Sequence, residues 1–347
     1  MKKLLYGAAA LVLTLALAAA ALFNTAVGQD TLLRGALSAL LVPPPAQPEG
    51  LRVVICGSAS PLGNDPDRAQ ACIAVLTPEH FFLVDVGARS PLRIAQAQLP
   101  MNRLTAVFLT HYHSDHIAAL PDVNLTSWVQ GRKGPLEVYG PAGIHDVVDG
   151  FNRAYQLDRG YRTAHHGAEL LPPAVGPMTP REITPGNVVW DDGRLKITSF
   201  LVSHPPIHPA VGYRIDYRGR SVVISGDSNA ADSLFAAADR VDLLLHDALS
   251  RSLLDPMIAA ATQNNIPVLP KIMKDVIDYH ADTLSLPERA RAAGVRQLAY
   301  YHLVPVPMTG LTERVFRRDL PDDVILVNDL QTFDLPPDST EIDISGP

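Results

Sequence analysis

The longest apolar run lies at the start of the chain. Lys2 and Lys3 precede residues 4–23, which are twenty apolar or small residues without a charge. About 20 such residues cross a hydrocarbon core of about 30 Å, so the run predicts a long secretory signal or a single membrane-spanning helix. Residues 26–28 offer a small-x-small cleavage site, and both alternatives stay open. In either case the lysines should remain inside, so the rest of the chain is expected to be exported, periplasmic or anchored by the N-terminal helix.

Beyond residue 50 the pattern changes to short apolar runs separated by turns and helical stretches. Strands are predicted at 52–56, 72–76, 81–85, 106–109, 136–139, 195–202, 212–217, 221–225, 243–246 and 297–301. Helices are predicted at 144–157, 232–238, 253–264 and 287–293. Strands and helices interspersed along the whole chain predict an α/β protein with helices covering the sheet faces, rather than an all-β sandwich or a bundle.

The same pattern divides the chain into four parts. Residues 1–28 are the predicted signal peptide or membrane anchor. Residues 29–50 are a linker with a short amphipathic helix at 31–41 and four prolines. Residues 51–336 are expected to form one folded domain, and the polar residues 337–347 are predicted to be a disordered tail.

Composition excludes some classes of function. Of 347 residues 47% are hydrophobic, which is too many for a disordered chain. The formal net charge is −7, from 29 Lys and Arg against 36 Asp and Glu. Nucleic-acid binding usually draws on a surplus of basic residues, because neutralising phosphates supplies much of the affinity. We therefore expect nucleic acid to be an unlikely partner.

The two cysteines, Cys56 and Cys72, lie in neighbouring predicted strands. Antiparallel pairing of these strands could bring them face to face, and an exported protein could then carry one disulfide. The alternative is that both are small buried hydrophobic residues.

The densest chemistry of the chain lies in residues 110–116. This segment, Thr-His-Tyr-His-Ser-Asp-His, follows a predicted strand and places three histidines and an aspartate within six residues. Imidazole and carboxylate groups suit zinc, with manganese or iron as alternatives. Three protein ligands per metal leave a position for a water whose pKa the metal lowers to about 7, which is a hydrolytic arrangement.

The pattern His-x-His-x-Asp-His after a strand resembles the signature of the metallo-β-lactamase fold superfamily. The resemblance implies an αββα sandwich of two mixed sheets with outer helices and a two-metal site at one edge. Matching segments end in Asp85-Val86-Gly87, His204, Ser225-Gly226-Asp227 and His302. It further implies that one divalent ion, most simply Zn²⁺, is held by His111, His113 and His204, a second by Asp115, His116 and His302, and that Asp227 bridges them.

Some of these remote positions have simpler alternatives. His208 competes with His204 but follows two prolines beyond the strand, so His204 is favoured. Asp227 could be an ordinary turn aspartate, and His302 could be a core histidine beside Tyr300 and Tyr301.

Further motifs resemble the ribonuclease Z and arylsulfatase-like branch of the superfamily. Residues 56–61 resemble its early glycine-serine-proline loop, and His246 and His280 match two later histidine elements. The resemblance implies that Asp115 holds and deprotonates the attacking water. His280 would then stabilise the leaving group, and His246 would orient the site. Asp247 replaces a glutamate, and its shorter side chain casts doubt on a proton relay through it. Asp227 stands where common zinc β-lactamases have cysteine, so antibiotic hydrolysis is not expected.

We therefore predict an exported dinuclear hydrolase of a small anionic phosphodiester, phosphate or sulfate ester. The alternatives are a ribonuclease Z-like 3′-tRNA processing endonuclease and a non-catalytic metal- or ligand-binding member. The ribonuclease is disfavoured because His204 and Asp227 are only 23 residues apart, which leaves no room for a tRNA-gripping arm. Residues 117–203 are predicted to supply a lid or pocket wall, with Arg159, Tyr161, Arg162 and His166 available to an anion; the alternative is a solvated surface excursion. A homo-oligomer stays open, as does membrane contact through an uncleaved N-terminal segment.

Overall fold

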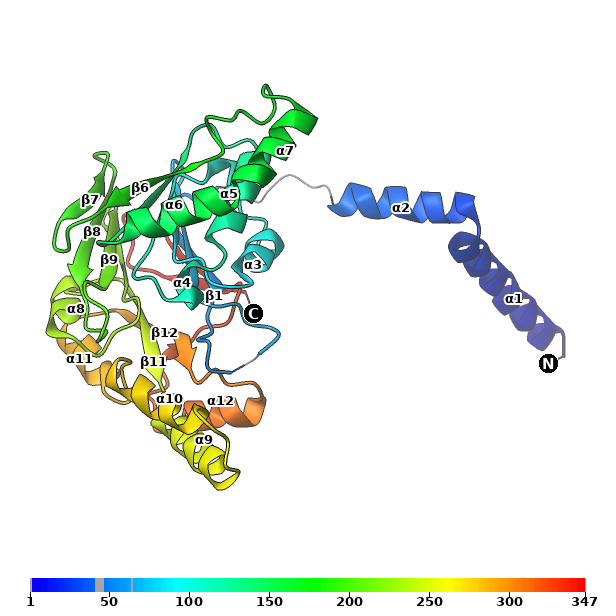
Figure 1. Ribbon diagram of the computed structural model, residues 1–347. Coiled ribbons are helices and arrows are strands. Elements are labelled where there is room, and N and C mark those ends of the chain that lie inside the picture. Colours follow the sequence, from blue (N-terminus) through cyan, green and yellow to red (C-terminus); the bar gives the residue numbers. More distant parts are fainter. Residues whose placement is uncertain (1, 41–46, 64, 347) are drawn as a thin grey trace. The chain divides into compact units, whose positions relative to one another are not determined.

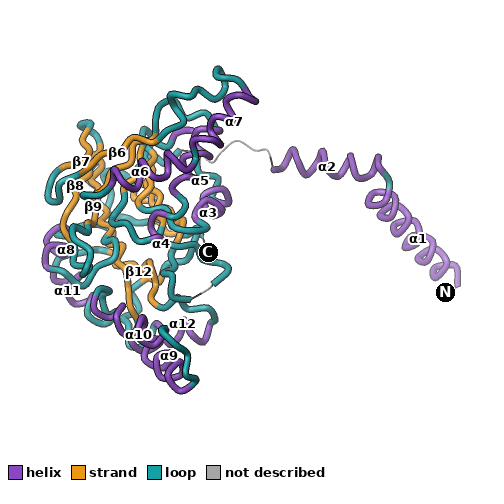
Figure 2. Tube along the Cα trace, viewed as in Figure 1, coloured by secondary structure: helices purple, strands orange, loops and turns teal. Residues whose placement is uncertain are grey.

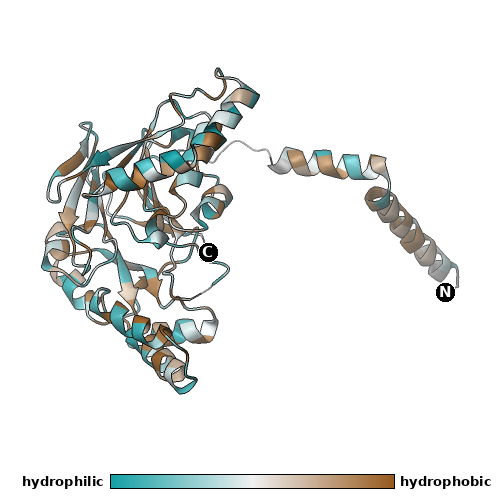
Figure 3. Ribbon diagram, in the orientation of Figure 1, coloured by the Kyte–Doolittle hydropathy of each residue, from teal (hydrophilic) through white to brown (hydrophobic). Residues whose placement is uncertain are grey.

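The N-terminal unit of the chain consists of two helices. The computed structural model describes residues 2–40, 47–63 and 65–346 and separates Met1–Pro45 from Ala46–Pro347. Helices α1 (Lys2–Asn24) and α2 (Ala26–Leu40) make up the first unit. Within α1, residues 6–24 are long and apolar enough to cross a membrane, and most of the helix has the hydrophobic colour in Figure 3. The predicted helix at 31–41 is the second half of α2, its last residue lying outside the described residues, as does part of the predicted linker.

The second unit contains two mixed sheets (Figure 1). In its described part, one sheet has the strand order β15-β14-β1-β2-β3-β4-β5-β6 and the other β13-β12-β11-β10-β9-β8-β7. The first sheet consists of β1 (Leu51–Gly57), β2 (Cys72–Leu76), β3 (Phe81–Val84), β4 (Ala106–Phe108), β5 (Leu136–Gly140), β6 (Met178–Glu182), β14 (Thr332–Leu335) and β15 (Asp343–Ser345). The second consists of β7 (Val188–Asp191), β8 (Leu195–Leu201), β9 (Val211–Tyr217), β10 (Arg220–Ile224), β11 (Leu243–Leu249), β12 (Gln297–Val304) and β13 (Ile325–Leu326).

The strands are apolar on both faces because each sheet packs against the other sheet on one face and against helices on the other. Side chains alternate across a strand, so Val53 and Ile55 of β1 belong to the core between the sheets, whereas Val54 and Cys56 belong to the outer layer. In the second sheet Tyr213 and Ile224 are among the residues that complete the inner core.

Helices cover the outer face of each sheet (Figure 2). On the first sheet these are α3 (Ser90–Gln96), α5 (Leu120–Val129) and α6 (Ile144–Ala154); on the second, α8 (Asp232–Ala237), α11 (Leu286–Ala292) and α12 (Gly310–Phe316). The other described helices are α4 (Ser114–Ile117), α7 (Gln156–His166), α9 (Arg251–Gln263), α10 (Leu269–Asp275) and the 3₁₀ turns Met101–Arg103 and Val276–Asp278. The predicted αββα sandwich is confirmed.

Strand direction brings several strand ends to one edge. β8, β9 and β10 are successively antiparallel, and β10, β11 and β12 are parallel. The carboxyl ends of β8, β10, β11 and β12 therefore share one edge of the second sheet. Residues that follow these strands are held by a rigid scaffold, which is the usual place for a site in an α/β fold.

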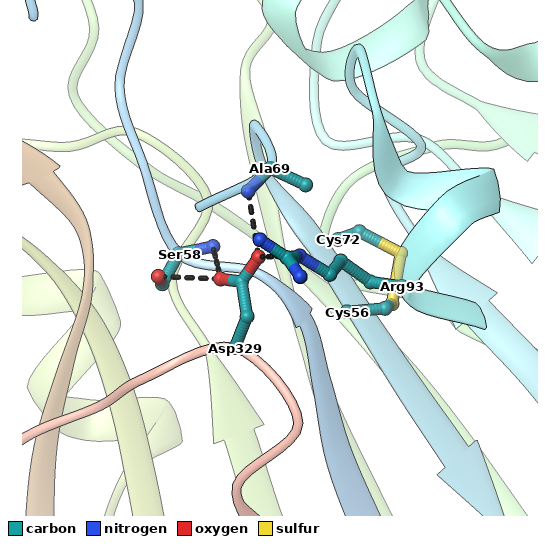
Figure 4. Close-up of a disulfide and its surroundings, with 6 residues drawn as sticks. All are labelled: Cys56, Ser58, Ala69, Cys72, Arg93 and Asp329. Atoms are coloured by element: carbon teal, nitrogen blue, oxygen red, sulfur yellow. Dashed lines mark hydrogen bonds and ion pairs between the residues drawn. A yellow bond between two sulfur atoms is a disulfide. The ribbon is translucent and has the colours of Figure 1, made fainter. Parts of the chain in front are cut away.

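The two cysteines form the disulfide that the sequence allowed. Cys56 is bonded to Cys72 between β1 and β2 (Figure 4). Beside it the buried Asp329 carboxylate accepts hydrogen bonds from Ser58, from the Ala69 amide and from Arg93. Burial raises the pKa of the Asp329 carboxyl, and these donors partly offset that effect. The base of the loop between β1 and β2 is thus fixed from two sides.

Removing this disulfide is expected to lower the free energy of unfolding. The bond closes a loop with a sequence separation of 16, and closing a loop of about this length stabilises a fold by about 3 kcal/mol. A Cys56→Ser and Cys72→Ser double variant should therefore unfold at lower urea concentration than the oxidised protein. An unchanged midpoint, with the oxidised bond confirmed by mass spectrometry in the parent, would contradict this.

The C-terminal segment is more ordered than its polar sequence indicated. Residues 343–345 form β15, which pairs with β14 in antiparallel register. The segment was predicted to be a disordered tail, but an edge strand needs few apolar side chains because its backbone bonds to the neighbouring strand.

Candidate metal centre

The strand end after β4 delivers the histidine-rich segment. His111 lies directly in the loop, whereas Asp115 and His116 lie on the short helix α4. His111, Asp115 and His116 are buried, and His113 is exposed. A strand, a loop and one helical turn thus present four ligand-type side chains at the sheet edge.

Remote strand ends bring three further side chains to this segment. Two groups of ligand atoms, each lying within 4.8 Å of one another, are His111, His113, His204 and Asp227, and Asp115, His116, Asp227 and His302. Asp227 Oδ2 lies 3.3 Å from His116 Nε2, 3.9 Å from His111 Nε2 and 4.0 Å from His204 Nε2. All seven residues expected from the resemblance meet at one place, with Asp227 shared by both groups.

The spacing of these atoms suits metal ions. His111 Nε2 lies 3.1 Å from His113 Nδ1, which lies 3.3 Å from His204 Nε2, and His302 Nε2 lies 3.0 Å from Asp115 Oδ2. Ligand atoms about 2.1 Å from a tetrahedral zinc ion would be about 3.4 Å apart. Among the described residues, the buried His116 Nε2 and Asp227 Oδ1 atoms have no hydrogen-bond partner. Buried polar atoms normally have one, so the cluster fits divalent cations.

The charges of the cluster support the same conclusion. Burial lowers the pKa of His204 to about 4, against the opposing effect of Asp227, and burial lowers the pKa of His111 well below its usual range. Both rings are therefore neutral at pH 7, as a metal ligand requires. Burial would raise the pKa of the Asp227 carboxyl, but His116 and His302 outweigh it and hold that pKa well below its usual range.

Backbone conformations with positive φ help to position two of these side chains, those of Asp227 and His302. Gly226, just before Asp227, has a φ of 64°, and a Cβ there would lie 2.8 Å from Thr110 Cβ. Only glycine fits this close approach, which brings the Asp227 turn against the histidine segment. His302 has a φ of 44° within β12, where the pairing with β11 shifts register beside Asp247. A left-handed residue inside a strand costs free energy and often marks a functional site.

Asp85 is a functional residue that we identified only as part of a turn. Its carboxylate lies 2.8 Å from His116 Nδ1 and accepts hydrogen bonds from the Thr110 amide and hydroxyl. A carboxylate on the outer nitrogen of a ligand histidine fixes the ring and its tautomer. Its position in the Asp-x-Gly turn at a strand end was the feature of the sequence that could have indicated this contact.

Replacing Asp85 with alanine is expected to weaken metal binding and activity about 10- to 100-fold. The His116 ring would lose the partner that orients it, while the ligand set itself would stay complete. Titration of the purified variant with Zn²⁺ measures the first effect. Wild-type zinc affinity in a folded Asp85→Ala variant would show that Asp85 does not position His116.

The two later histidines occupy different surroundings. His280 Nδ1 lies 2.8 Å from Asp247 Oδ2, and His280 lines the pocket beside the cluster. His246 Nδ1 lies 3.0 Å from Asp247 Oδ1, but its ring is fully buried, stacks near Phe235 and does not line that pocket. The aspartate side chain therefore reaches both rings, although its length had cast doubt on a link through residue 247.

The predicted lid lies elsewhere. Arg159 donates to the Asn152 carbonyl, Arg162 pairs with Asp158, and neither they nor Tyr161 and His166 line the pocket at the cluster. Other residues that line this pocket come instead from α10, from the turn that follows it and from residues 60–62. Sequence reasoning missed α10, although the apolar spacing of Leu269, Ile272 and Val276 was a usable helical signal.

Comparison with known proteins identifies the family. The model of the metallo-beta-lactamase superfamily matches residues 65–265. A protein named ribonuclease Z from Mycobacterium bovis (strain BCG / Pasteur 1173P2) is 36% identical over 267 residues, covering 76% of this chain and 90% of the relative. The crystal structure of the short form of human tRNase Z has a TM-score of 0.58 at 20% identity, covering 81% and 98% of the two chains. That of the metallo-beta-lactamase fold protein YhfI from Bacillus subtilis has a TM-score of 0.57 at 19% identity, covering 82% and 98%.

These relatives correct two predictions. A small exported phosphate or sulfate ester was the wrong main choice of substrate, and nucleic acid was wrongly judged an unlikely partner, since the similar chains are named ribonuclease Z. The missing arm was a poor criterion, because a short β9–β10 hairpin joins His204 to Asp227 in a chain that aligns with 90% of such a relative. Net charge was also a poor criterion, because it is a sum that hides local fields.

The matched segment includes more than half of the 347 residues and six of the seven clustered ligand-type residues. The sandwich architecture of the chain agrees with that of the two solved structures over nearly the whole length of those structures. We conclude that the chain is a member of the metallo-beta-lactamase superfamily of metal-dependent hydrolases.

Proposed function

We propose that this chain is a ribonuclease Z-type endonuclease that hydrolyses a phosphodiester bond at the 3′ side of precursor tRNA. The observation that carries the proposal is the 36% identity to a ribonuclease Z along 90% of that protein's length. The cluster of seven ligand-type residues, centred on a shared carboxylate, supports it because two-metal sites are a common solution for phosphodiester hydrolysis.

Two divalent ions, most simply Zn²⁺, complete the proposed site. His111, His113 and His204 would hold one, Asp115, His116 and His302 the other, and Asp227 both. When bound, such ions supply Lewis-acid activation of the phosphoryl group and of the attacking water. Because His111 and His204 are neutral at pH 7, they can bind the metal ions without first losing a proton.

Asp115 is suited to hold and orient the attacking water. Burial would raise the pKa of its carboxyl, but His116 and His302 outweigh burial and hold that pKa well below its usual range. The group is thus ionised at neutral pH, and it lines the pocket next to His113. We assign it the role of holding and orienting the water.

His280 is suited to protonate the departing oxygen. Its Nδ1 hydrogen is directed to Asp247, so Nε2 remains for the substrate. A carboxylate behind a histidine fixes the tautomer and stabilises the protonated ring, as in other acid–base pairs. Asp247 is fully buried, and hydrogen bonds from His246 and His280 outweigh burial and lower its pKa. We assign His246 the role of orienting Asp247.

One region of the acidic chain gathers basic side chains. A hollow of about 530 Å³ lies where β8 and β10 begin, at the edge opposite the metal site. Two carboxylates and six cationic residues line it: Arg194, Lys196, Arg214, Arg218, Arg220 and Arg240. Four of these cations are paired with carboxylates, Arg194 with Glu79, Arg214 with Asp216, Arg220 with Asp242 and Arg240 with Asp239. The hollow therefore carries little unpaired positive charge, and the proposal does not depend on it.

Cleavage of a precursor tRNA by the full-length protein tests the proposal. A transcript with a 3′ trailer should be cut in the presence of Zn²⁺ or Mn²⁺, and the same transcript without a trailer should stay intact. A His113→Ala variant should be inactive. Failure to cut the trailer while bis(p-nitrophenyl) phosphate is hydrolysed would overturn the RNA substrate, and failure on both substrates would overturn the phosphodiesterase.

We further propose that α1 directs the chain to a membrane as signal or anchor. Residues 6–24 support this by length and apolarity, and the disulfide supports a destination where thiols become oxidised. Cell fractionation and alkylation of free thiols test the two points together. Full-length protein found wholly in the soluble cytosolic fraction, with Cys56 and Cys72 reduced, would contradict the proposal.

A further inference from the structure

A pocket of about 400 Å³ opens beside the proposed metal centre. One side carries residues of the centre, including His113, Asp115, His280 and His302. Its volume is within the range of roughly 300–1,000 Å³ typical of small-molecule sites, which is more than a phosphate group needs. The remainder of the pocket must therefore accommodate another part of the substrate.

Much of the remaining lining is apolar and belongs to α10 and its neighbours. Leu269, Ile272 and Val276 lie three and four positions apart, so they share one face of a helical segment and line the pocket together. Leu62 and Tyr279 extend this apolar wall. The wall offers no charged side chain to a phosphate.

The wall rests on a rigid base. Val276 is buried in a small core together with Leu254, Met273 and Val304, and Leu269 and Tyr279 pack against it. Ile272 by contrast is 46% exposed, although it lines the pocket. Ile272 therefore offers an accessible aliphatic surface to a ligand in the pocket, next to the fixed side chain of Val276.

The aromatic content of the pocket indicates a flat ligand. The Tyr279 ring lies 4.7 Å from the His204 ring and 4.9 Å from the His280 ring between their centroids. Phosphate oxygens lose hydration against such a surface and gain no hydrogen bond, whereas a nucleobase presents a π-face that stacks on aromatic rings and tolerates aliphatic contact.

We propose that the apolar wall of Leu62, Leu269, Ile272, Val276 and Tyr279 binds the nucleobase adjacent to the scissile phosphodiester. The base would then hold the phosphate next to His280 and Asp115. This proposal rests on the proposed function, because it specifies which part of the RNA the active-site pocket holds. Affinity at this subsite should depend on an unpaired base and only weakly on salt concentration, whereas binding of the phosphate backbone depends strongly on salt concentration.

Equilibrium binding to the zinc-loaded full-length protein tests the subsite without turnover. Calorimetry with methyl phosphate, hexyl phosphate and uridine 5′-monophosphate compares the same phosphate with no apolar group, an alkyl chain and a base. Uridine 5′-monophosphate should bind at least about fivefold more tightly than methyl phosphate, because base stacking commonly contributes that much. Ile272→Ser and Leu269→Ser should each remove most of this advantage and leave methyl phosphate binding unchanged.

Val268→Ser is the matched control, since Val268 is 69% exposed, adjoins α10 and does not line the pocket. It should bind all three ligands as the wild type does. Equal affinity of the wild type for methyl phosphate and uridine 5′-monophosphate would overturn the subsite. Tighter binding of hexyl phosphate than of the nucleotide would overturn it in favour of an alkyl substituent. Nucleotide selectivity in a protein that does not cut precursor tRNA would uphold the subsite and refute the tRNA substrate alone.

Discussion

Replacing Asp227 with alanine should lower kcat/KM for RNA cleavage by about 10³ or more. The carboxylate approaches His116, His111 and His302 at 3.3, 3.9 and 3.4 Å, so its removal takes one ligand from both proposed metal sites. Loss of several kcal/mol of transition-state stabilisation gives such a factor, because each 1.36 kcal/mol changes a rate tenfold. Steady-state kinetics and metal analysis of the purified variant measure the two losses.

A matched histidine provides the control for this experiment. His208 lies close to His204 in sequence but is exposed and belongs to neither ligand group. His208→Ala should retain the wild-type metal content and rate, whereas His204→Ala should lose both. A folded Asp227→Ala variant that keeps two metal ions and a rate within tenfold of wild type would refute the shared-ligand assignment.

Replacing His280 with alanine should lower kcat about 10²- to 10⁴-fold while metal content stays unchanged. This is the usual range for loss of a general acid or base. His280 belongs to neither ligand group, yet it lines the pocket and is bonded to Asp247 at 2.8 Å. The loss should be greatest for substrates with a poor leaving group, because p-nitrophenolate departs without needing a proton.

Asp247 acts through His280, so its replacement needs a different measurement. Asp247→Asn should lower kcat and leave the metal content unchanged, since a carboxamide no longer fixes the His280 ring in the tautomer that directs Nε2 to the substrate. KM should change little. Loss of metal from either variant in proportion to activity would show that the pair is structural, and the assignment to proton transfer would then fail.

The interior of the fold could be predicted from sequence because the inner strands are continuous apolar runs. β2 and β3 are apolar and buried along their whole length, and no polar face competes with that pattern. β6 was missed because its sequence, Met-Thr-Pro-Arg-Glu, has neither alternation nor β-branched enrichment. Its place in the sheet depends on parallel pairing with β5, which is a tertiary contact that no local pattern records.

The site was predictable where a ligand follows an apolar strand directly. His111 and Asp227 both do so, and the resemblance to a known family supplied the grouping of all seven residues. The roles of Asp85 and Asp247 depend on contacts between segments far apart in sequence, at 31 residues to His116 and 33 to His280. The contact of the Asp247 side chain with both histidine rings depends in addition on the register shift between β11 and β12. The length of the side chain alone does not reveal that shift.

The pairing of β1 with β14 determines when the protein can mature. Leu51 lies opposite Leu335 in that pairing, so the first sheet is complete only after both residue 51 and residue 335 have been synthesised. The ligand groups likewise need His302 as well as His111. The centre therefore cannot assemble before residue 302 has been synthesised, and metal loading follows that point. A chain that crosses a membrane unfolded would consequently acquire its ions in the compartment where it folds.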